Sequence, residues 1–459
     1  MATETVDTAE LEYPASDWKG FFADHFGPSM LWALISIGGS HIVLGPEMGA
    51  TFGLFAIWIV AIVYLAKYGA WELGIRYNYG VGGNPVEAYD QLPGPKNWMQ
   101  WYTVAVFTIA YIGITAGVGM STAALVAGVF PALSVPQWFV VLITIAGALV
   151  FLTRYSLLEK ILMAFTIALG LLLVLGVIVG PPSGEVIGET AFSIDLGGDR
   201  TIIFVALFAA MAGFAPTGFS TSVLIGSWSM AKGEGASQLR AEGVDLRDER
   251  YHDYIAAWIR TGRRDFNIGY AFSFILLVAM VILASNVLYP EPPGDPNFAL
   301  AVGEILSASF GDWSFWAMTV GAFAALYSTV ITLLDGASRA TSDILPMALE
   351  NDELRSEPIR RGVLVAFVIL SSITVLILGN VPVTFIVAIA AVLALTEILF
   401  YPANWYVVTR NLPERFQPSS TWVAYYVVSL VVVAIFGIMG AAVELDLVPE
   451  LIDLVPGLN

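Results

Sequence analysis

The sequence predicts an all-α integral membrane protein with about eleven transmembrane helices. Of its 459 residues, 57% are hydrophobic and only 13% are charged, and the mean hydropathy is +0.76. Soluble proteins are about 25% charged, so this chain has too few charges to coat a water-soluble body of its size. Apolar stretches long enough to cross roughly 30 Å of hydrocarbon recur along the chain, and basic residues gather on alternate connections between them.

Connections rich in proline and glycine separate the expected spans. Examples are QLPGPK at 91–96, GPPSGE at 180–185 and PEPPGDPN at 290–297. In chain order the expected spans are 28–47, 51–72, 101–128, 135–153, 160–180, 201–227, 266–288, 313–335, 361–379, 382–406 and 420–441.

The basic residues predict the orientation, because Lys and Arg favour the cytoplasmic side of a membrane. With the N-terminus inside, nineteen of the 20 basic residues fall on inner segments, and only Arg200 falls outside. We therefore expect a cytoplasmic tail at 1–27, one transmembrane domain at 28–441 with a long cytoplasmic loop at 228–265, and an external acidic tail at 442–459. The expected location is the plasma membrane.

Charge and composition restrict the partners. The net charge is -18, which disfavours nucleic acid because phosphate binding requires a basic face. The chain has no cysteine and three histidines, which excludes disulfides and disfavours a multi-histidine zinc site. An acidic chain with five Lys and fifteen Arg is typical of a halophilic prokaryote, although acidic tails alone would also give this balance. The expected partners are the lipid bilayer and a small molecule or ion; the oligomeric state stays open.

Two expected spans, the first and the sixth, are interrupted where a membrane helix should be continuous. Gly and Pro at mid-span leave backbone groups that lipid cannot satisfy, so such breaks usually line a cavity. Breaks five spans apart correspond in two inverted five-helix repeats, where they form the substrate site of transporters. The alternative is a pair of packing kinks. The predicted substrate-binding residues are Gly38, Gly39, Ser40 and His41 in the first span, and Ala212, Ala215, Pro216 and Thr217 in the sixth.

Ionisable groups at membrane depth are rare and usually functional. His41 lies in the first break and can change charge near neutral pH; alternatively it is a neutral histidine bonded to a backbone carbonyl. Glu72 and Asp335 each precede an arginine by four residues, which alternatively makes them members of helix-end ion pairs. The predicted coupling or gating residues are Glu47, Glu72, Asp335 and Glu397.

Three stretches resemble the Nramp family of divalent-metal transporters. GPSMLWALISIGG at 27–39 and MGATFGLFAIWIV at 48–60 are similar to that family's first two spans, and ALYSTVITLLDGASRATSDIL at 325–345 is similar to its eighth. The resemblance implies a LeuT-like fold, a 5+5 inverted repeat with broken helices 1 and 6. It also implies transport by alternating access.

The metal ligands of that family are missing from this chain. In the first span, the family's Asp and Asn correspond to Gly38 and His41. In the sixth, its Met and His correspond to Ala215 and Thr217. A divalent metal in a dry site requires charge and matched ligands, which Gly38 and Ala215 do not supply. No metal site is therefore predicted.

The predicted function is secondary active transport of a small solute across the plasma membrane, and the favoured solute is a cation. The chain has no P-loop motif, so a sodium or proton gradient is the expected energy source, and no cofactor is expected. The alternatives are a true divalent-metal (Mn, Fe or Mg) transporter that uses backbone carbonyls and water, a transporter of a small organic or zwitterionic solute, and a non-transporting membrane sensor. An enzyme is disfavoured because His41 and Glu47 share no helical face.

Overall fold

The computed structural model describes residues 7–152, 156–197 and 200–447. Arg154, the start of the N-terminal tail and the acidic tail from residue 448 lie outside the described residues. The described part is helical and contains no strand. Its α-helices are α1 (Trp18–Gly20), α2 (Pro28–Ser36), α3 (Gly45–Phe52), α4 (Ala56–Val81), α5 (Trp98–Ala105), α6 (Tyr111–Val129), α7 (Val135–Phe151), α8 (Ser156–Val179), α9 (Gly184–Thr190), α10 (Arg200–Phe214), α11 (Ser222–Ala231), α12 (Ser237–Ala241), α13 (His252–Leu288), α14 (Gly294–Glu304), α15 (Ser307–Phe310), α16 (Ser314–Leu349), α17 (Glu357–Leu378), α18 (Pro382–Asn411) and α19 (Ser420–Glu444).

Each of the predicted spans has a helix in the structure. Nine stretches of the described residues are long and apolar enough to cross a membrane, and one of them, Ile37–Val81, contains two spans. The chain turns between those two spans at Gly53, whose φ of +59° is accessible to glycine without strain. The fourth span is the shorter apolar helix α7. The predicted all-α membrane fold is therefore confirmed.

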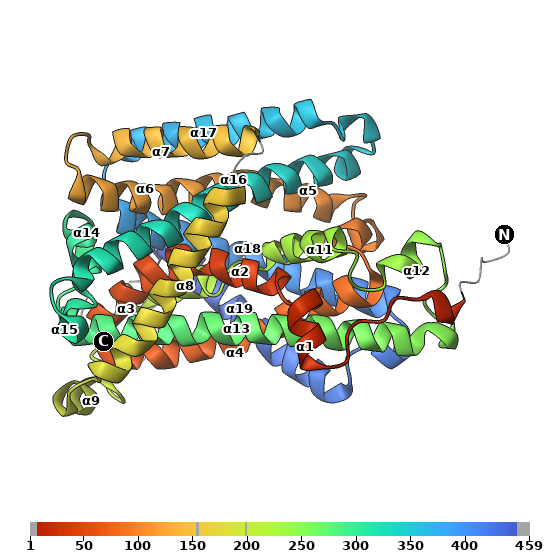
Figure 1. Ribbon diagram of the computed structural model, residues 1–459, viewed down its shortest axis with the longest axis horizontal. Helices are drawn as coiled ribbons and strands as arrows, with labels where there is room; N and C mark the ends of the chain where they lie inside the picture. Colours follow the sequence, from red (N-terminus) through yellow and green to blue (C-terminus); the bar gives the residue numbers. More distant parts are fainter. Residues whose placement is uncertain (1–6, 153–155, 198–199, 448–459) are drawn as a thin grey trace.

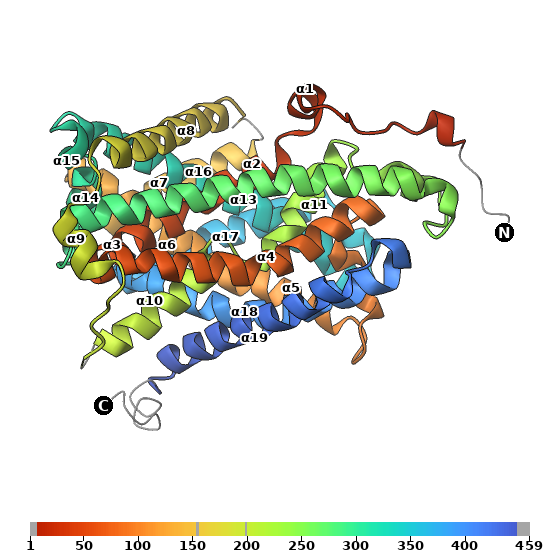
Figure 2. The same ribbon diagram turned by 90° about the horizontal axis from the view of Figure 1, so that it is seen from below.

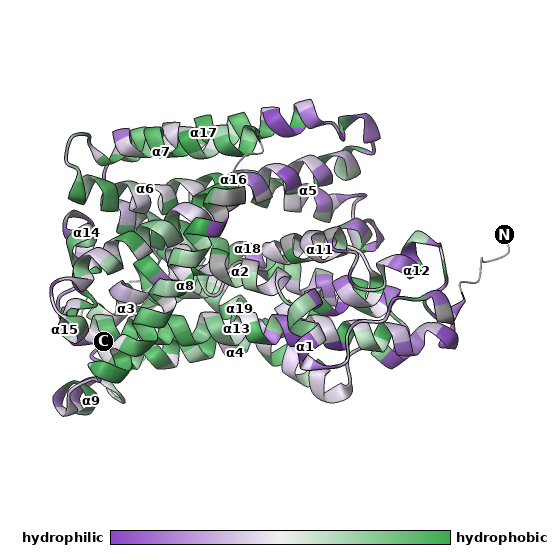
Figure 3. Ribbon diagram, viewed as in Figure 1, coloured by the Kyte–Doolittle hydropathy of each residue, from purple (hydrophilic) through white to green (hydrophobic). Residues whose placement is uncertain are grey.

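The long helices form one elongated bundle (Figure 1). Hydrophobic residues dominate along these helices, and hydrophilic residues gather at the end that carries α1 and α12 (Figure 3). α4 and α13 run side by side along the bundle, and α19 lies against α4 (Figure 2). This pattern is what a bilayer requires, because lipid faces the apolar flanks and water faces the ends.

The first and sixth spans lie at the centre of the bundle. Every residue from 37 to 44 is buried, and so is every residue from 209 to 222. α3 of the first span packs against α13, and α11 of the sixth packs against α4. The two contacts are equivalent. α13 follows the sixth span and packs on the first, and α4 follows the first span and packs on the sixth. This correspondence is the one expected of two five-helix repeats.

Several helices extend beyond the apolar stretches that predicted them. α4 continues to Val81, and α13 already begins at His252. The connector before α13 is therefore shorter than the predicted 228–265 loop. The polar ends stay helical because they find partners: the carboxylate of Asp265 in α13 accepts hydrogen bonds from the N–H groups of Gly27 (3.1 Å) and Ser29 (2.8 Å), which begin the first span.

Candidate functional site at the helix breaks

The first span is kinked in the way that its glycines predict. α2 passes into a π-helical segment, Ile37–Leu44, before α3 begins, and Gly38 at its start has ψ of -106°, outside the helical range. A Cβ on Gly38 would lie 2.5 Å from Thr329 Oγ1, and a Cβ on Gly39 would lie 2.8 Å from the Phe214 ring. The two glycines therefore allow the sixth and eighth spans to approach the first. The break is therefore a kink at Gly38 between two helical segments.

The sixth span is fully interrupted. α10 ends at Phe214, residues 215–218 are not helical, and a 3-10 turn (Phe219–Thr221) leads into α11. The Ala215–Pro216 peptide bond is cis. An interruption of this kind leaves the last carbonyls of one half-helix and the first N–H groups of the other without helical partners. Both sets find partners in side chains from other spans.

Lys67 of α4 provides the partner for the carbonyl end. Its Nζ donates hydrogen bonds to the carbonyl oxygens of Ala212 (2.6 Å), Thr217 (2.8 Å) and Gly213 (3.4 Å). The side chain is only 1% exposed, and its ammonium lies 5.1 Å from the centre of the Phe219 ring. A positive charge is favourable there because the carbonyl end of a helix is the negative end of its dipole.

The prediction for Lys67 was wrong. The basic-residue pattern placed Lys67 among the cytoplasmic residues, but it lies near the middle of α4, buried in the bundle. One signal in the sequence was available. A single lysine within the apolar run 54–66 and 68–71 is a costly residue at membrane depth, which by itself indicates a buried partner.

Glu397 of α18 provides the partner for the N–H end. The side chain is 1% exposed, and Oε2 accepts a hydrogen bond from the N–H of Phe219, where the chain re-enters helix. Oε1 has no hydrogen-bond partner among the described residues, and a Cβ on Gly218 would lie 2.7 Å from it. A carboxylate is favourable at the positive end of a helix dipole. The break therefore carries two buried side chains of opposite formal charge, one at each side.

A small cavity lies between the two breaks. It has a volume of about 40 Å³. Its wall is mostly apolar, with side chains such as Phe214 and Leu393. The residues along it that carry a hydroxyl group are Ser36, Tyr111, Thr217, Thr221 and Thr329. One water molecule needs about 10–15 Å³ of such volume, so the cavity has room for an ion with little hydration but not for an amino acid.

The structure separates the predicted substrate residues into two groups. Gly39, Pro216 and Thr217 line the cavity. Ala212 and Ala215 are buried beside it, and the carbonyl of Ala212 is bonded to Lys67. Gly38 contacts the eighth span at the same level, as described above. The breaks therefore do meet at one place, as the inverted repeat predicts.

Ser40 and His41 face away from this cavity. The His41 ring is fully buried, with Nε2 2.8 Å from the carbonyl oxygen of Ser273 and Nδ1 2.9 Å from that of Ser36. Ser40 Oγ lies 2.9 Å from Nδ1. This geometry is that of the alternative interpretation of His41, in which it is a core histidine bonded to backbone carbonyls. It holds the first span against α13.

Three of the predicted coupling or gating residues form ion pairs or reach the breaks. Glu72 is 1% exposed and pairs with Arg76 (2.9 Å) in its own helix. It also accepts hydrogen bonds from Arg263 of α13 and Tyr426 of α19. Asp335 pairs with the arginine four residues on, at 2.8 Å. Glu397 contacts the sixth break, whereas Glu47 is only partly buried and lies in α3.

The described residues contain no group of three or more His, Cys, Asp or Glu side chains that could hold a metal ion. Among these residues, the ligand atoms at the breaks are hydroxyl and carbonyl oxygens and a single carboxylate, that of Glu397. Ca²⁺ and Mg²⁺ sites normally include carboxylates, and softer metals require nitrogen or sulfur ligands. The donor set therefore does not fit a divalent transition metal.

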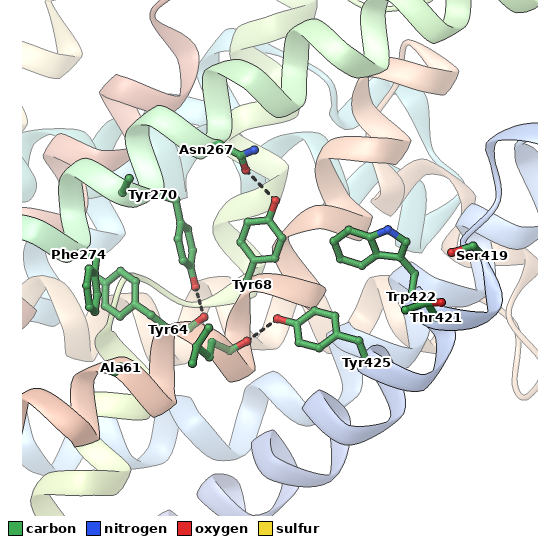
Figure 4. Close-up of a pocket in the computed structure, with 12 residues that line it drawn as sticks. Ala61, Tyr64, Tyr68, Asn267, Tyr270, Phe274, Ser419, Thr421, Trp422 and Tyr425 are labelled. Atoms are coloured by element: carbon green, nitrogen blue, oxygen red, sulfur yellow. Dashed lines mark hydrogen bonds between the residues drawn. The ribbon is translucent and has the colours of Figure 1, made fainter.

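A second, larger hollow lies on the flank of the bundle (Figure 4). It has a volume of about 800 Å³ and lies beside Leu65, which is 68% exposed. Aromatic side chains of α4, α13 and α19 line it: Tyr64, Tyr68, Tyr270, Phe274, Trp422 and Tyr425. The hydroxyls of Tyr270 and Tyr68 are already bonded, to the carbonyl oxygen of Tyr64 and to Asn267 Oδ1, each at 2.7 Å. The hollow thus presents mainly ring faces, and its oxygen atoms are not arranged to surround an ion.

Comparisons with known sequences agree with this architecture. A family model described as natural resistance-associated macrophage protein-like (Nramp) matches residues 29–443. An uncharacterized protein of Pasteurella multocida strain Pm70 is 25% identical over 394 residues, which cover 82% of this chain and 84% of that protein.

Solved structures show the same fold at low identity. A variant of the manganese transporter of Eremococcus coleocola has a TM-score of 0.69 and 11% identity, over 97% of this chain and 93% of that one. MhsT in complex with L-phenylalanine has a TM-score of 0.56 and 14% identity, over 92% and 99% of the two chains. Mhp1, a nucleobase-cation-symport-1 family transporter, has a TM-score of 0.52 and 14% identity, over 95% of each chain. The predicted LeuT-like fold is confirmed.

Proposed function

This chain belongs to the Nramp family and is a multi-pass secondary transporter, and we propose that its substrate is a small monovalent cation. The single observation that supports this choice is the cavity between the breaks, which is about 40 Å³ and whose mostly apolar wall includes five residues that carry a hydroxyl group. Membership of a transporter family sets aside the enzyme and the non-transporting sensor. The small volume argues against an organic or zwitterionic solute.

Electrostatics argue against a divalent ion in this cavity. The ammonium of Lys67 is bonded to the carbonyl of Thr217, which itself lines the cavity. At a separation of about 5 Å and an effective dielectric of 20, an ammonium repels a divalent cation by roughly 7 kcal/mol and a monovalent one by roughly 3. The carboxylate of Glu397 at the same break offsets the ammonium for either ion, so the two side chains together present no net negative charge. A divalent ion then lacks both the neutralising charge and the several carboxylate ligands that it normally requires.

Uptake into proteoliposomes tests the proposal. Purified protein is reconstituted, and saturable uptake of radiolabelled sodium, rubidium and manganese ions is compared with that of protein-free vesicles. We expect saturable uptake of a monovalent ion and none of manganese. Saturable manganese uptake would overturn the proposal and support the alternative of a divalent-metal transporter.

A hydroxyl deletion links the uptake to the cavity. Thr217→Val removes a hydroxyl that lines the cavity and accepts a hydrogen bond from Trp32 Nε1 at 2.9 Å. We expect a monovalent uptake affinity lower by about 5- to 10-fold, since a lost hydrogen bond is worth about 1 kcal/mol. Thr166→Val is the matched control, because Thr166 is buried and bonded only to the carbonyl of Leu162 in its own helix. Equal losses in both variants would contradict this assignment.

The coupling ion and the orientation remain part of the proposal. We place the N-terminus in the cytoplasm, because nearly all basic residues then lie on inner segments, and we expect a sodium or proton gradient as the driving force. Uptake at an imposed pH gradient without sodium, compared with a sodium gradient at equal pH, separates the two.

A further inference from the structure

The carbonyl end of the sixth break has the form of a cation site. The oxygens of Ala212, Gly213 and Thr217 converge on one point, at 2.6, 3.4 and 2.8 Å from the nitrogen that they surround. The ring of Phe219 lies 5.1 Å from that nitrogen. Carbonyl oxygens at a helix C-terminus together with an aromatic face are the surroundings that attract a small cation in a dry interior.

That point is occupied by a cation of the protein itself. We propose that Lys67 is a tethered cation that permanently fills this site, where a small free ammonium-sized cation would otherwise bind. The side chain reaches it from α4, and its ammonium is the only group among the described residues that donates hydrogen bonds to all three carbonyls. Because the cation is covalently attached, it does not exchange with the solution. The transporter therefore needs no free co-ion at this position.

The opposite side of the break supplies the counter-charge. Glu397 accepts a hydrogen bond from the N–H of Phe219, three residues after Pro216, which has no backbone N–H, and its second oxygen has no partner among the described residues. A buried ammonium without a carboxylate in the same region would be far more costly. The pair thus keeps the break near electrical neutrality while the cavity beside it stays free for the transported ion.

This inference deepens the proposed function, and it rests on that function only in treating the break as part of the transport site. Its test uses protein stability instead of uptake. A failure of the monovalent-cation proposal would therefore leave the result of this test unchanged.

The experiment removes the tether and offers the cation separately. Lys67→Ala deletes Cγ, Cδ, Cε and Nζ, which together correspond to propylammonium. The midpoint of thermal unfolding, Tm, is measured in detergent for the purified protein with and without methylammonium, propylammonium and tetramethylammonium chloride. We expect Lys67→Ala to lose about 3–5 °C, because a buried charge pair is broken. Propylammonium should restore at least half of the loss, methylammonium less, and tetramethylammonium, which has no N–H donor, none.

Three other proteins serve as controls. The wild type should not respond to propylammonium, since its site is filled. Lys67→Met fills the same space without the charge, so it should lose stability and should not be rescued. Lys96→Ala removes a lysine whose side chain is 76% exposed and should behave like the wild type.

Two results would overturn the inference. One is a propylammonium response of equal size in the wild type, Lys67→Met and Lys67→Ala. The other is a wild-type Tm for Lys67→Met, which would mean that Lys67 acts by filling space. Should Lys67→Ala be too unstable to purify, the Lys67→Met measurement decides the question alone.

Discussion

Replacing Gly39 by alanine adds one methyl group at the wall of the central cavity. The new Cβ would lie 2.8 Å and 3.2 Å from two carbons of the Phe214 ring and 3.4 Å from Val118. Alanine gains about 0.5–1 kcal/mol over glycine in a helix, whereas overpacking costs about 1–3 kcal/mol. The net destabilisation is then on the order of 1 kcal/mol, so the protein should still fold.

The effect on the transported ion should be larger than the effect on folding. The cavity measures about 40 Å³, and one group of the size of a water molecule needs about 10–15 Å³ of such volume. The added Cβ meets the Phe214 ring, which also lines the cavity, so displacement of that ring reduces the space for the ion. If the overpacking acts on the ion-bound state, affinity falls by about 5- to 150-fold. Concentration-dependent uptake of a monovalent ion into proteoliposomes measures this change, with Tm recorded on the same preparation.

Gly170→Ala is the matched control. Its Cβ would lie 2.9 Å from Leu276 Cδ1, a crowding as close as that at Gly39 but between α8 and α13, away from the cavity. We expect a similar change in Tm and an unchanged uptake affinity. The reasoning is refuted if Gly39→Ala transports like the wild type, or if Gly170→Ala loses as much affinity as Gly39→Ala does.

Two further predictions concern the ion pairs and the orientation. Glu72→Gln leaves two arginines of the buried network without a carboxylate, and the loss of about 3–5 kcal/mol should lower Tm by roughly 3–5 °C in a chain of this length. Asp352→Asn, whose side chain is 90% exposed, should leave Tm unchanged, and equal Tm values for the two variants would show that the network is not stabilising. The chain has no cysteine, so the single variants Ser237→Cys and Pro456→Cys report topology directly. In intact cells an impermeant thiol reagent should label position 456, which lies outside the described residues, and should not label position 237. The reverse labelling pattern would overturn the orientation.

Much of the fold was predictable because its causes are local or compositional. A run of about 20 apolar residues is sufficient to cross a bilayer, so the spans follow from hydropathy alone. Clustered glycine and proline in the middle of an apolar run are typical of a helix break, so the interruptions at Gly38 and Pro216 were visible in the sequence. The spacing of five spans between these breaks then indicated that they meet, and the structure places Gly39, Pro216 and Thr217 around one cavity.

The roles of the buried polar groups depended on the tertiary structure. The sequence indicates that His41 and Lys67 are ionisable, but not which helix each side chain meets. Packing of the first span on α13 turns His41 toward Ser273, and packing of α4 on the sixth span brings Lys67 to the carbonyls at the end of α10. Those contacts join residues more than 140 positions apart in the sequence. They depend on the rotation of each helix about its axis, and this rotation is set by the packing of side chains between neighbouring helices. The positions of the two breaks along the chain therefore predicted that two broken helices meet, whereas the lysine that fills one of the breaks became visible with the packing of α4 on the sixth span.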